Sequence, residues 1–182
     1  MLIHRPDNGS VDLTFPSDAV VVVAGVPGAG KTTLLRRTVD RSVARVVDTD
    51  DRARRGPLLY PGHYARIVAA VAGRRPVVIH SRGTLPVTRR MIALLARLRG
   101  RPAHLLLLNA DRPAAEAGQR RRGRMVSQDE MDRQVARWHA LMAAGGPTGE
   151  GWASVQVLDR EAAAQVGAMR FVPVAQTLPQ LV

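Results

Sequence analysis

The sequence predicts an α/β fold in which helices cover both faces of a parallel sheet of five strands. Two observations support this prediction. Short apolar segments alternate with longer segments of helical periodicity, as in consecutive β-α-β units. The apolar segments are also continuously apolar rather than alternating, which is typical of strands buried on both faces. They span residues 19–25, 43–47, 76–80, 104–108 and 154–158.

Helical segments are expected between and after these strands. They span residues 31–40, 61–72, 86–99 and 111–122, and a further helix follows Ser127. Ser127 and Glu130 have the spacing of a capping box, which predicts the start of that last helix. The helix at 86–99 carries the apolar residues Val87, Met91, Leu94, Leu95 and Leu98. Gly100 is expected to end it in a left-handed conformation.

The 182 residues are expected to form one principal domain over residues 19–170, with a helical lid near residues 112–144. Val11, Leu13 and Phe15 alternate with polar residues, so residues 1–18 are an N-terminal extension or a short edge strand. Residues 171–182 are expected to be an irregular C-terminal tail.

The composition excludes several classes of protein. With 46% apolar and 23% charged residues the chain is globular. No run of 18 apolar residues predicts a membrane span, and the first ten residues lack the apolar core of a signal peptide. The absence of cysteine excludes disulfides, thiolate zinc sites and cysteine nucleophiles. We therefore expect a cytoplasmic protein with no membrane partner.

The formal net charge of +12 leaves two kinds of partner open. A nucleic acid is possible, but phosphate-bearing nucleotides fit basic charge equally well. Of the 27 basic residues only Lys31 is a lysine, so a coding bias toward GC-rich codons is an alternative explanation for part of the arginine excess. Aromatic residues are 3% of the chain, which is little material for stacking single-stranded bases.

A phosphate-binding motif follows the first predicted strand. Residues 25–32 match G-x-x-x-x-G-K-[ST] in full, between a buried strand and a helix, as the motif requires. The loop backbone and the helix N-terminus are expected to hold the phosphates of ATP. Lys31 can bridge the β- and γ-phosphates, and the Thr32 hydroxyl can ligate Mg²⁺. The predicted nucleotide-binding residues are Gly25, Val26, Pro27, Gly28, Ala29, Gly30, Lys31, Thr32 and Thr33.

Acidic residues follow the second predicted strand, at the sheet edge where ligands bind in α/β proteins. Asp50 is the first candidate for the base that binds the acceptor hydroxyl and takes its proton. Asp48 is the candidate partner of Mg²⁺, and Asp51 is a candidate cap or supporting residue. The alternative is a solvated acidic turn that caps the next helix.

The third predicted strand ends with His80, Ser81 and Arg82, where many P-loop proteins have the Walker B aspartate. Magnesium must then depend on Thr32, on the phosphates and on an acid from residues 48–51. Arg82 or Ser81 can contact the substrate. His80 is interpreted more readily as a core histidine whose hydrogen bonds are satisfied.

Arginines after the fourth and fifth strands complete the candidate site. Arg120 and Arg124 are four residues apart in a basic segment, and they are predicted to close over the triphosphate and to neutralise its charge during transfer. A solvated helix end is the alternative. Arg160 is predicted to flank the adenine. Residues 108–111 lack the lysine of the guanine-selecting N-K-x-D, which favours ATP over GTP.

With these motifs in this order, residues 19–165 resemble the small P-loop kinases, which include shikimate, gluconate and polynucleotide kinases and the AAA_33 group of ATPase-like proteins. Residues 48–50 are similar to the D-x-D of shikimate-type kinases. Residues 50–52 are similar to the polynucleotide kinase segment whose first Asp activates a 5′-hydroxyl. The resemblance implies a P-loop NTPase fold of three layers with strand order 2-3-1-4-5. Residues 80–84 lack both the polynucleotide kinase acid and the shikimate kinase glycines, so the acceptor is not carried over.

The predicted function is transfer of the γ-phosphate of ATP to a hydroxyl, on a small metabolite or at the 5′ end of a polynucleotide. A regulatory ATPase without an acceptor is the alternative. A nucleotide-binding protein without turnover is a third class. A well-positioned acid turn favours the kinase, because a kinase must order an acceptor hydroxyl near a base.

Replacing Lys31 tests the motif. Lys31→Ala removes the ammonium from the loop, so ATP binding is expected to weaken by about 1.5–3 kcal/mol and turnover to fall further while the fold persists. Calorimetric titration with ATP and a turnover assay measure both effects. Wild-type affinity together with wild-type turnover would contradict the phosphate-binding assignment.

Overall fold

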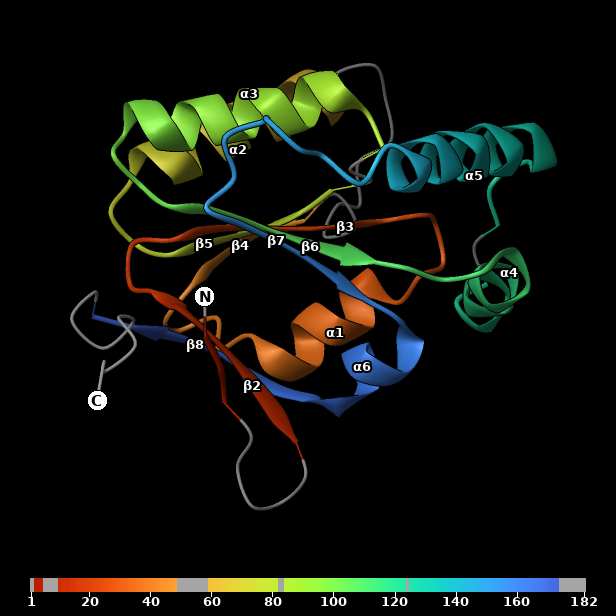
Figure 1. Ribbon diagram of the computed structural model, residues 1–182, viewed down its shortest axis with the longest axis horizontal. Helices are drawn as coiled ribbons and strands as arrows, with labels where there is room; N and C mark the ends of the chain where they lie inside the picture. Colours follow the sequence, from red (N-terminus) through yellow and green to blue (C-terminus); the bar gives the residue numbers. More distant parts are fainter. Residues whose placement is uncertain (1, 5–9, 49–58, 82–83, 124, 174–182) are drawn as a thin grey trace.

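The computed structural model confirms the predicted sheet (Figure 1) and describes residues 2–4, 10–48, 59–81, 84–123 and 125–173. The main sheet contains β3 (Val20–Gly25), β4 (Arg45–Val47), β5 (Val77–His80), β6 (Ala103–Leu108) and β7 (Ser154–Leu158). The strands lie in the order β4-β5-β3-β6-β7, and all neighbouring pairs are parallel. Counted along the chain within this sheet, that order is the predicted 2-3-1-4-5.

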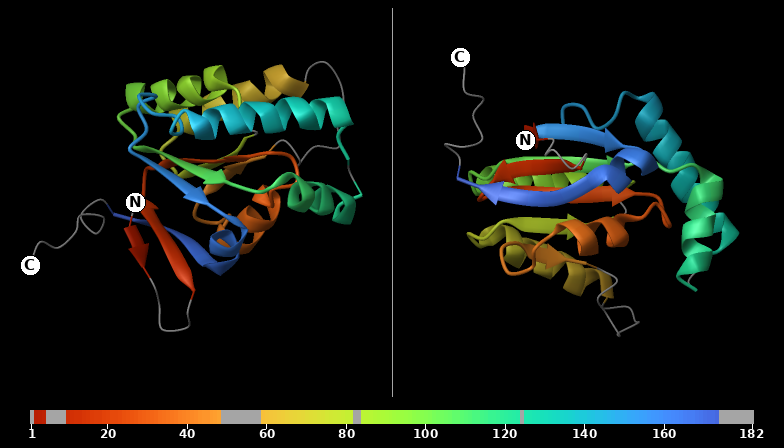
Figure 2. Two further views of the ribbon diagram at one scale, coloured as in Figure 1. Left: turned by 45° about the vertical axis from the view of Figure 1, so that its right-hand side comes forward. Right: turned by 90° about the horizontal axis from the view of Figure 1, so that it is seen from below.

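Helices cover both faces of this sheet and its carboxyl edge (Figures 1 and 2). Helices α2 (Leu59–Ala72), α3 (Pro86–Leu98) and α5 (Gln128–Ala143) lie over one face, and α1 (Lys31–Thr38) and α6 (Arg160–Gln165) over the other. Helix α4 (Arg112–Arg121) lies beyond the carboxyl end of β6. In the described ranges, no helix combines the length and apolar character that crossing a membrane requires.

Strand β3 is the centre of two apolar clusters. Its residues from Val20 to Ala24 have no solvent-exposed surface. Val22 contributes to the cluster under α2, α3 and α5, which also contains Ile92 and Trp138. Val23 contributes to the cluster under α1. The continuous apolar pattern therefore arises because successive side chains enter opposite cores.

Helix α3 faces the sheet with a side that its apolar pattern indicated only in part, because Met91 and Leu95 pack against the cluster but are not its most buried residues. Its buried residues are Arg89, Ile92, Ala93 and Ala96, whereas Val87, Leu94 and Leu98 are exposed. The alanines allow close packing on the sheet. Arg89 is accommodated because its guanidinium donates two hydrogen bonds, of 2.9 and 3.0 Å, to the Glu150 carboxylate. Gly100 follows with the expected positive φ of 63°.

A second, three-stranded sheet packs against α1, below it in the view of Figure 1. It contains β1 (Leu2–His4), β2 (Val11–Pro16) and β8 (Val166–Val172) in the order β1-β2-β8, with β2 parallel to β8. Leu13 and Phe15 of β2 and Met169 of β8 are buried in the cluster under α1. The short strand considered for residues 1–18 is thus β2, in the middle of this sheet. Strand β8 was not predicted from the sequence pattern.

One buried arginine joins several segments at the amino end of the main sheet. Arg101 is 7% exposed. Its guanidinium donates hydrogen bonds to the carbonyls of Asp18 (2.7 Å), Val71 (2.8 Å), Gly73 (2.8 Å) and Arg75 (2.6 Å). Two of these carbonyls lie at the C-terminal end of α2, where helical carbonyls lack partners in the helix. Arg101 thereby connects α2 to the loops before β3 and β5.

Arg101→Met is expected to destabilise the protein by about 2–5 kcal/mol, because several buried carbonyls lose a charged donor at once. Arg99→Met is the matched control: Arg99 is exposed and donates one hydrogen bond, to the carbonyl of Ala72. We expect the control to change stability by less than about 1 kcal/mol. Urea denaturation measures both, and equal losses would show that Arg101 does not have this role.

Candidate nucleotide-binding site

The P-loop connects β3 to α1 and is pressed against α4. Gly28 has a φ of 92°, and a Cβ atom there would lie 1.9 Å from the Ala115 carbonyl oxygen. A Cβ on Gly118 of α4 would lie 2.3 Å from the Gly28 carbonyl oxygen. Side chains at either position are therefore excluded, and two backbones meet directly. The loop keeps its curvature because α4 supports it from outside.

The loop ends at a helix terminus suited to an anion. Gly30 is the N-cap of α1, without a side-chain cap hydrogen bond, and the first turn contains no acidic residue. Helix N-termini carry unpaired N–H groups and partial positive charge, which favour phosphate. Lys31 is 6% exposed, and its ammonium donates hydrogen bonds to the carbonyls of Gly25 (2.8 Å) and Val26 (2.9 Å). The only lysine is thus held at the loop.

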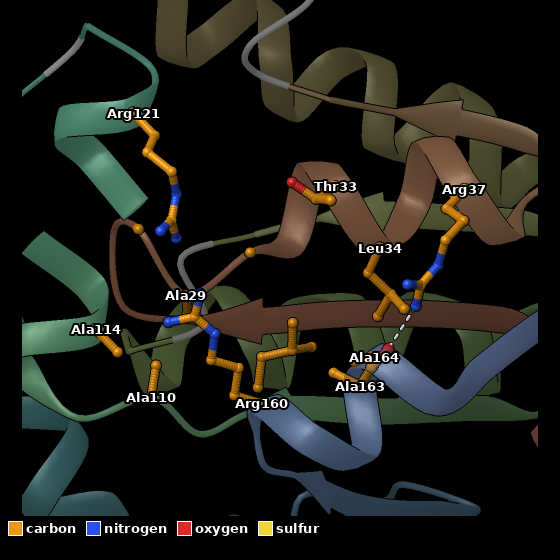
Figure 3. Close-up of a pocket in the computed structure, with 13 residues that line it drawn as sticks. Ala29, Thr33, Leu34, Arg37, Ala110, Ala114, Arg121, Arg160, Ala163 and Ala164 are labelled. Atoms are coloured by element: carbon orange, nitrogen blue, oxygen red, sulfur yellow. Dashed lines mark hydrogen bonds between the residues drawn. The ribbon is translucent and has the colours of Figure 1, made fainter. Parts of the chain in front are cut away.

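A pocket of about 190 Å³ opens beside the loop (Figure 3). Arg121 of α4 and Arg160 of α6 both extend toward the P-loop, and alanines of α4 and α6 supply apolar surface. Arg37 of α1 donates a hydrogen bond of 2.6 Å to the Ala163 carbonyl, which joins α1 to α6. An apolar pocket with cationic groups beside an anion site matches the base, ribose and phosphates of a nucleotide.

Gln119 connects the P-loop to the lid segment. It is 3% exposed, its amide nitrogen donates to the Pro27 carbonyl (3.4 Å), and its amide oxygen accepts from the Val126 backbone (2.8 Å). Trp138 of α5 is 1% exposed and donates to the Asn109 side chain (3.0 Å). Within the predicted lid, α5 is therefore anchored in the core. Gln119 was not predicted as a site residue, and its only signal in the sequence is that an uncharged residue precedes three arginines.

The predicted arginines lie in different surroundings. Arg160 lines the pocket, and its place beside the adenine stays a prediction. Arg120 is exposed, and its guanidinium lies 3.9 Å from a Glu116 carboxylate oxygen. Arg124 lies outside the described residues. The catalytic roles of Arg120 and Arg124 stay predictions. Arg121 was not predicted, although Ala114, Gly118 and Arg121 share the i, i+4, i+7 spacing of one helix face.

The acidic segment after β4 is described only at Asp48. This carboxylate is 3% exposed, and one of its oxygens is hydrogen-bonded to Nδ1 of His80, the last residue of β5. His80 is 7% exposed. The Arg66 guanidinium lies 3.5 Å from the Asp48 carbonyl oxygen and 3.4 Å from Nδ1 of His63. Asp50 and Arg82 lie outside the described residues, so their roles stay predictions.

Two oxygen donors among the described residues are of a kind that suits magnesium arriving with a nucleotide. Among the described residues, no group of three or more His, Cys, Asp or Glu side chains forms a metal cage. Mg²⁺ at phosphate sites keeps several waters and takes few protein ligands, usually oxygens. The Thr32 hydroxyl and the Asp48 carboxylate are of this kind.

The family follows from comparison with known proteins. Residues 20–144 match AAA_33, a family of AAA domains, so the chain belongs to this family, as the motifs predicted. No curated protein matches the sequence significantly.

Solved structures with a similar fold include the following three proteins. One belongs to the PezAT chromosomal toxin-antitoxin system of Streptococcus pneumoniae (TM-score 0.59, 12% identity, covering 83% of this chain and 71% of that one). A gluconokinase from Sinorhizobium meliloti has a TM-score of 0.58 and 19% identity, and the match covers 83% of this chain and 93% of that one. Chaetomium thermophilum Kti12 in complex with ADP-AlF3 has a TM-score of 0.56 and 20% identity, and the match covers 81% of this chain and 94% of that one. At these identities the likeness shows the fold alone.

Arg121 and Arg120 form a matched pair for testing the pocket. Arg121→Ala is expected to weaken ADP binding on the order of three- to tenfold, the effect of losing a cationic contact to the base or phosphates. Arg120→Ala is expected to leave ADP affinity close to wild type, because ADP lacks the γ-phosphate whose charge Arg120 is predicted to neutralise during transfer. Calorimetric titration with ADP decides, and equal effects would contradict the pocket assignment.

Proposed function

We propose that this protein is an ATP-dependent phosphotransferase that moves the γ-phosphoryl group to a hydroxyl of a small metabolite or of a polynucleotide 5′ end. The observation that carries the proposal is the complete P-loop at the uncapped N-terminus of α1, with Lys31 buried at the loop and the arginine-lined pocket beside it. This arrangement supplies a place for each part of a nucleoside triphosphate.

The nucleotide is proposed to lie with its base between Arg121 and Arg160 and its phosphates along the P-loop. Asn109 is followed by Ala110 rather than the lysine of a guanine-selecting motif, which favours ATP. Thr32 is proposed to ligate Mg²⁺ directly, and Asp48 to act on the ion through the groups that lie between them. When bound, the ion neutralises charge on the β- and γ-phosphate oxygens.

The acceptor is proposed to bind near the carboxyl ends of β4 and β5, where Asp48 and His80 lie. Asp50 takes the proton of the acceptor hydroxyl while the hydroxyl oxygen forms a bond to the γ-phosphorus. The bond from that phosphorus to the β–γ bridging oxygen breaks, and ADP leaves with the electron pair. Arg120 and Arg124 neutralise charge on the transferring group. Every atom of the step comes from ATP, the acceptor and Asp50.

The acceptor class requires a direct screen. Labelled ATP and Mg²⁺ are incubated with hydroxyl metabolites and, in parallel, with an RNA oligonucleotide carrying a 5′-hydroxyl. A polynucleotide acceptor also predicts RNA affinity that falls steeply with salt, because neutralised phosphates release counterions. Weak binding at low salt without 5′ labelling would favour a small acceptor.

Asp50→Asn tests the transfer chemistry and the alternative of a regulatory ATPase. The substitution keeps size and hydrogen bonding but removes basicity. We expect nearly unchanged ATP affinity and phosphoryl transfer slower by about 10²–10⁴-fold. Asp51→Asn is the matched control and is expected to retain most activity.

A regulatory ATPase in which Asp50 caps a helix predicts a different result. It would lose at most about 0.5–2 kcal/mol of stability and keep its turnover. Normal turnover in folded Asp50→Asn protein would therefore remove the proposed base and favour that alternative. Melting temperature, ATP affinity and turnover on the same sample separate the two functions.

A further inference from the structure

His80 occupies the place between the acid of β4 and the P-loop strand. In the sheet, β5 lies between β4 and β3, and His80 is paired with Val23 near the end of β3. The next residue, Ser81, donates a backbone hydrogen bond of 3.0 Å to the Val23 carbonyl. Adjacent strands are about 4.8 Å apart, so Asp48 begins roughly 10 Å from the strand that carries the P-loop. His80 is on the strand between them, and its ring is hydrogen-bonded to Asp48.

The bond to Asp48 determines what the other side of the ring can do. An ionised carboxylate only accepts hydrogen bonds, so Nδ1 of His80 carries the hydrogen. In a neutral imidazole, Nε2 is then an acceptor with a lone pair. Asp48 is the one hydrogen-bond partner found for the ring among the described residues. A buried carboxylate thus fixes the tautomer and orientation of a histidine, as it does behind many ligand-bound histidines.

We infer that His80 replaces the Walker B carboxylate, and that its Nε2 accepts a hydrogen bond from a water on the nucleotide's Mg²⁺. The inference rests on the proposed nucleotide binding and deepens it. Mg²⁺ prefers oxygen ligands and keeps several waters, whose hydrogens need acceptors. The imidazole therefore acts through water. Asp48 acts through the imidazole, as the positioning residue that supplies negative charge behind it.

A purely structural pair that joins β4 to β5 makes a different prediction. Loss of such a pair would lower stability and weaken nucleotide binding equally with and without the metal. A residue that holds magnesium-bound water affects only the gain in affinity that Mg²⁺ provides. Measuring ADP affinity in EDTA and in saturating Mg²⁺ separates these cases and needs no turnover.

Two substitutions divide the functions of the ring. His80→Asn places an amide donor near the Nδ1 position, which keeps the partner of Asp48 but removes the acceptor at Nε2. His80→Gln places an amide oxygen near the Nε2 position. His104→Asn is the control: His104 is a buried histidine near the amino end of β6, its Nδ1 lies 2.8 Å from the Ser154 hydroxyl, and burial lowers its pKa to about 4.

His80→Asn is expected to reduce the Mg²⁺-dependent gain in ADP affinity by about three- to tenfold, the value of one hydrogen bond, and to leave the affinity in EDTA unchanged. His80→Gln should retain the gain within about twofold, and His104→Asn should match wild type in both media. An unchanged gain in His80→Asn, or equal losses in both media, would overturn the inference.

Folding and nucleotide binding are checked on the same samples. If His80→Asn does not melt cooperatively, His80→Gln decides: a retained gain supports the inference, and a lost gain in folded protein overturns it. Wild-type protein that binds no ADP in either medium would instead refute the proposed function, and this inference with it.

Discussion

The contact between two backbones, the P-loop and α4, determines the geometry of the whole candidate site. Gly28 and Gly118 meet where neither tolerates a Cβ atom. This contact fixes the rotation of α4 about its own axis. As a result, Arg121 lines the pocket and Gln119 reaches the Pro27 carbonyl. The anion-binding loop and the cationic wall of the pocket are therefore positioned by one interface, which is made of main chain and is insensitive to side-chain rotamers.

Local patterns predicted the main sheet and the P-loop, because both are encoded by neighbouring residues. Buried strands give continuous apolar segments, and the loop has a fixed spacing of glycines before Lys31. Contacts between distant segments were not predictable in this way. The orientation of Arg121 depends on where α4 begins and on what it packs against. The pairing of Asp48 with His80 depends on two strand ends being neighbours in space, which neither residue signals alone.

The arginine content also has a different meaning once the side chains are placed. Arg89 and Arg101 are buried and bind Glu150 and backbone carbonyls, respectively. They stabilise helix packing and chain connections rather than presenting charge to a partner. Arg89 and Glu150 already cancel within the formal charge of +12, so of these two arginines only Arg101 withdraws positive charge from the surface. For a polyanion, the arginines beside the P-loop matter more than the total.

The parallel pairing of β2 with β8 has a consequence for the order of assembly. Val11 is paired with Val166, so β2, which has β1 as its first neighbour, acquires its second neighbour only after the main sheet has been synthesised. Until then, Leu13 and Phe15 lack the β8 side of their cluster. Pairings of such large sequence separation form slowly, because a long loop must close first. During synthesis on the ribosome, this small sheet is the last part of the fold to be completed. Until then, its exposed apolar strand is where a chaperone or a neighbouring chain would bind.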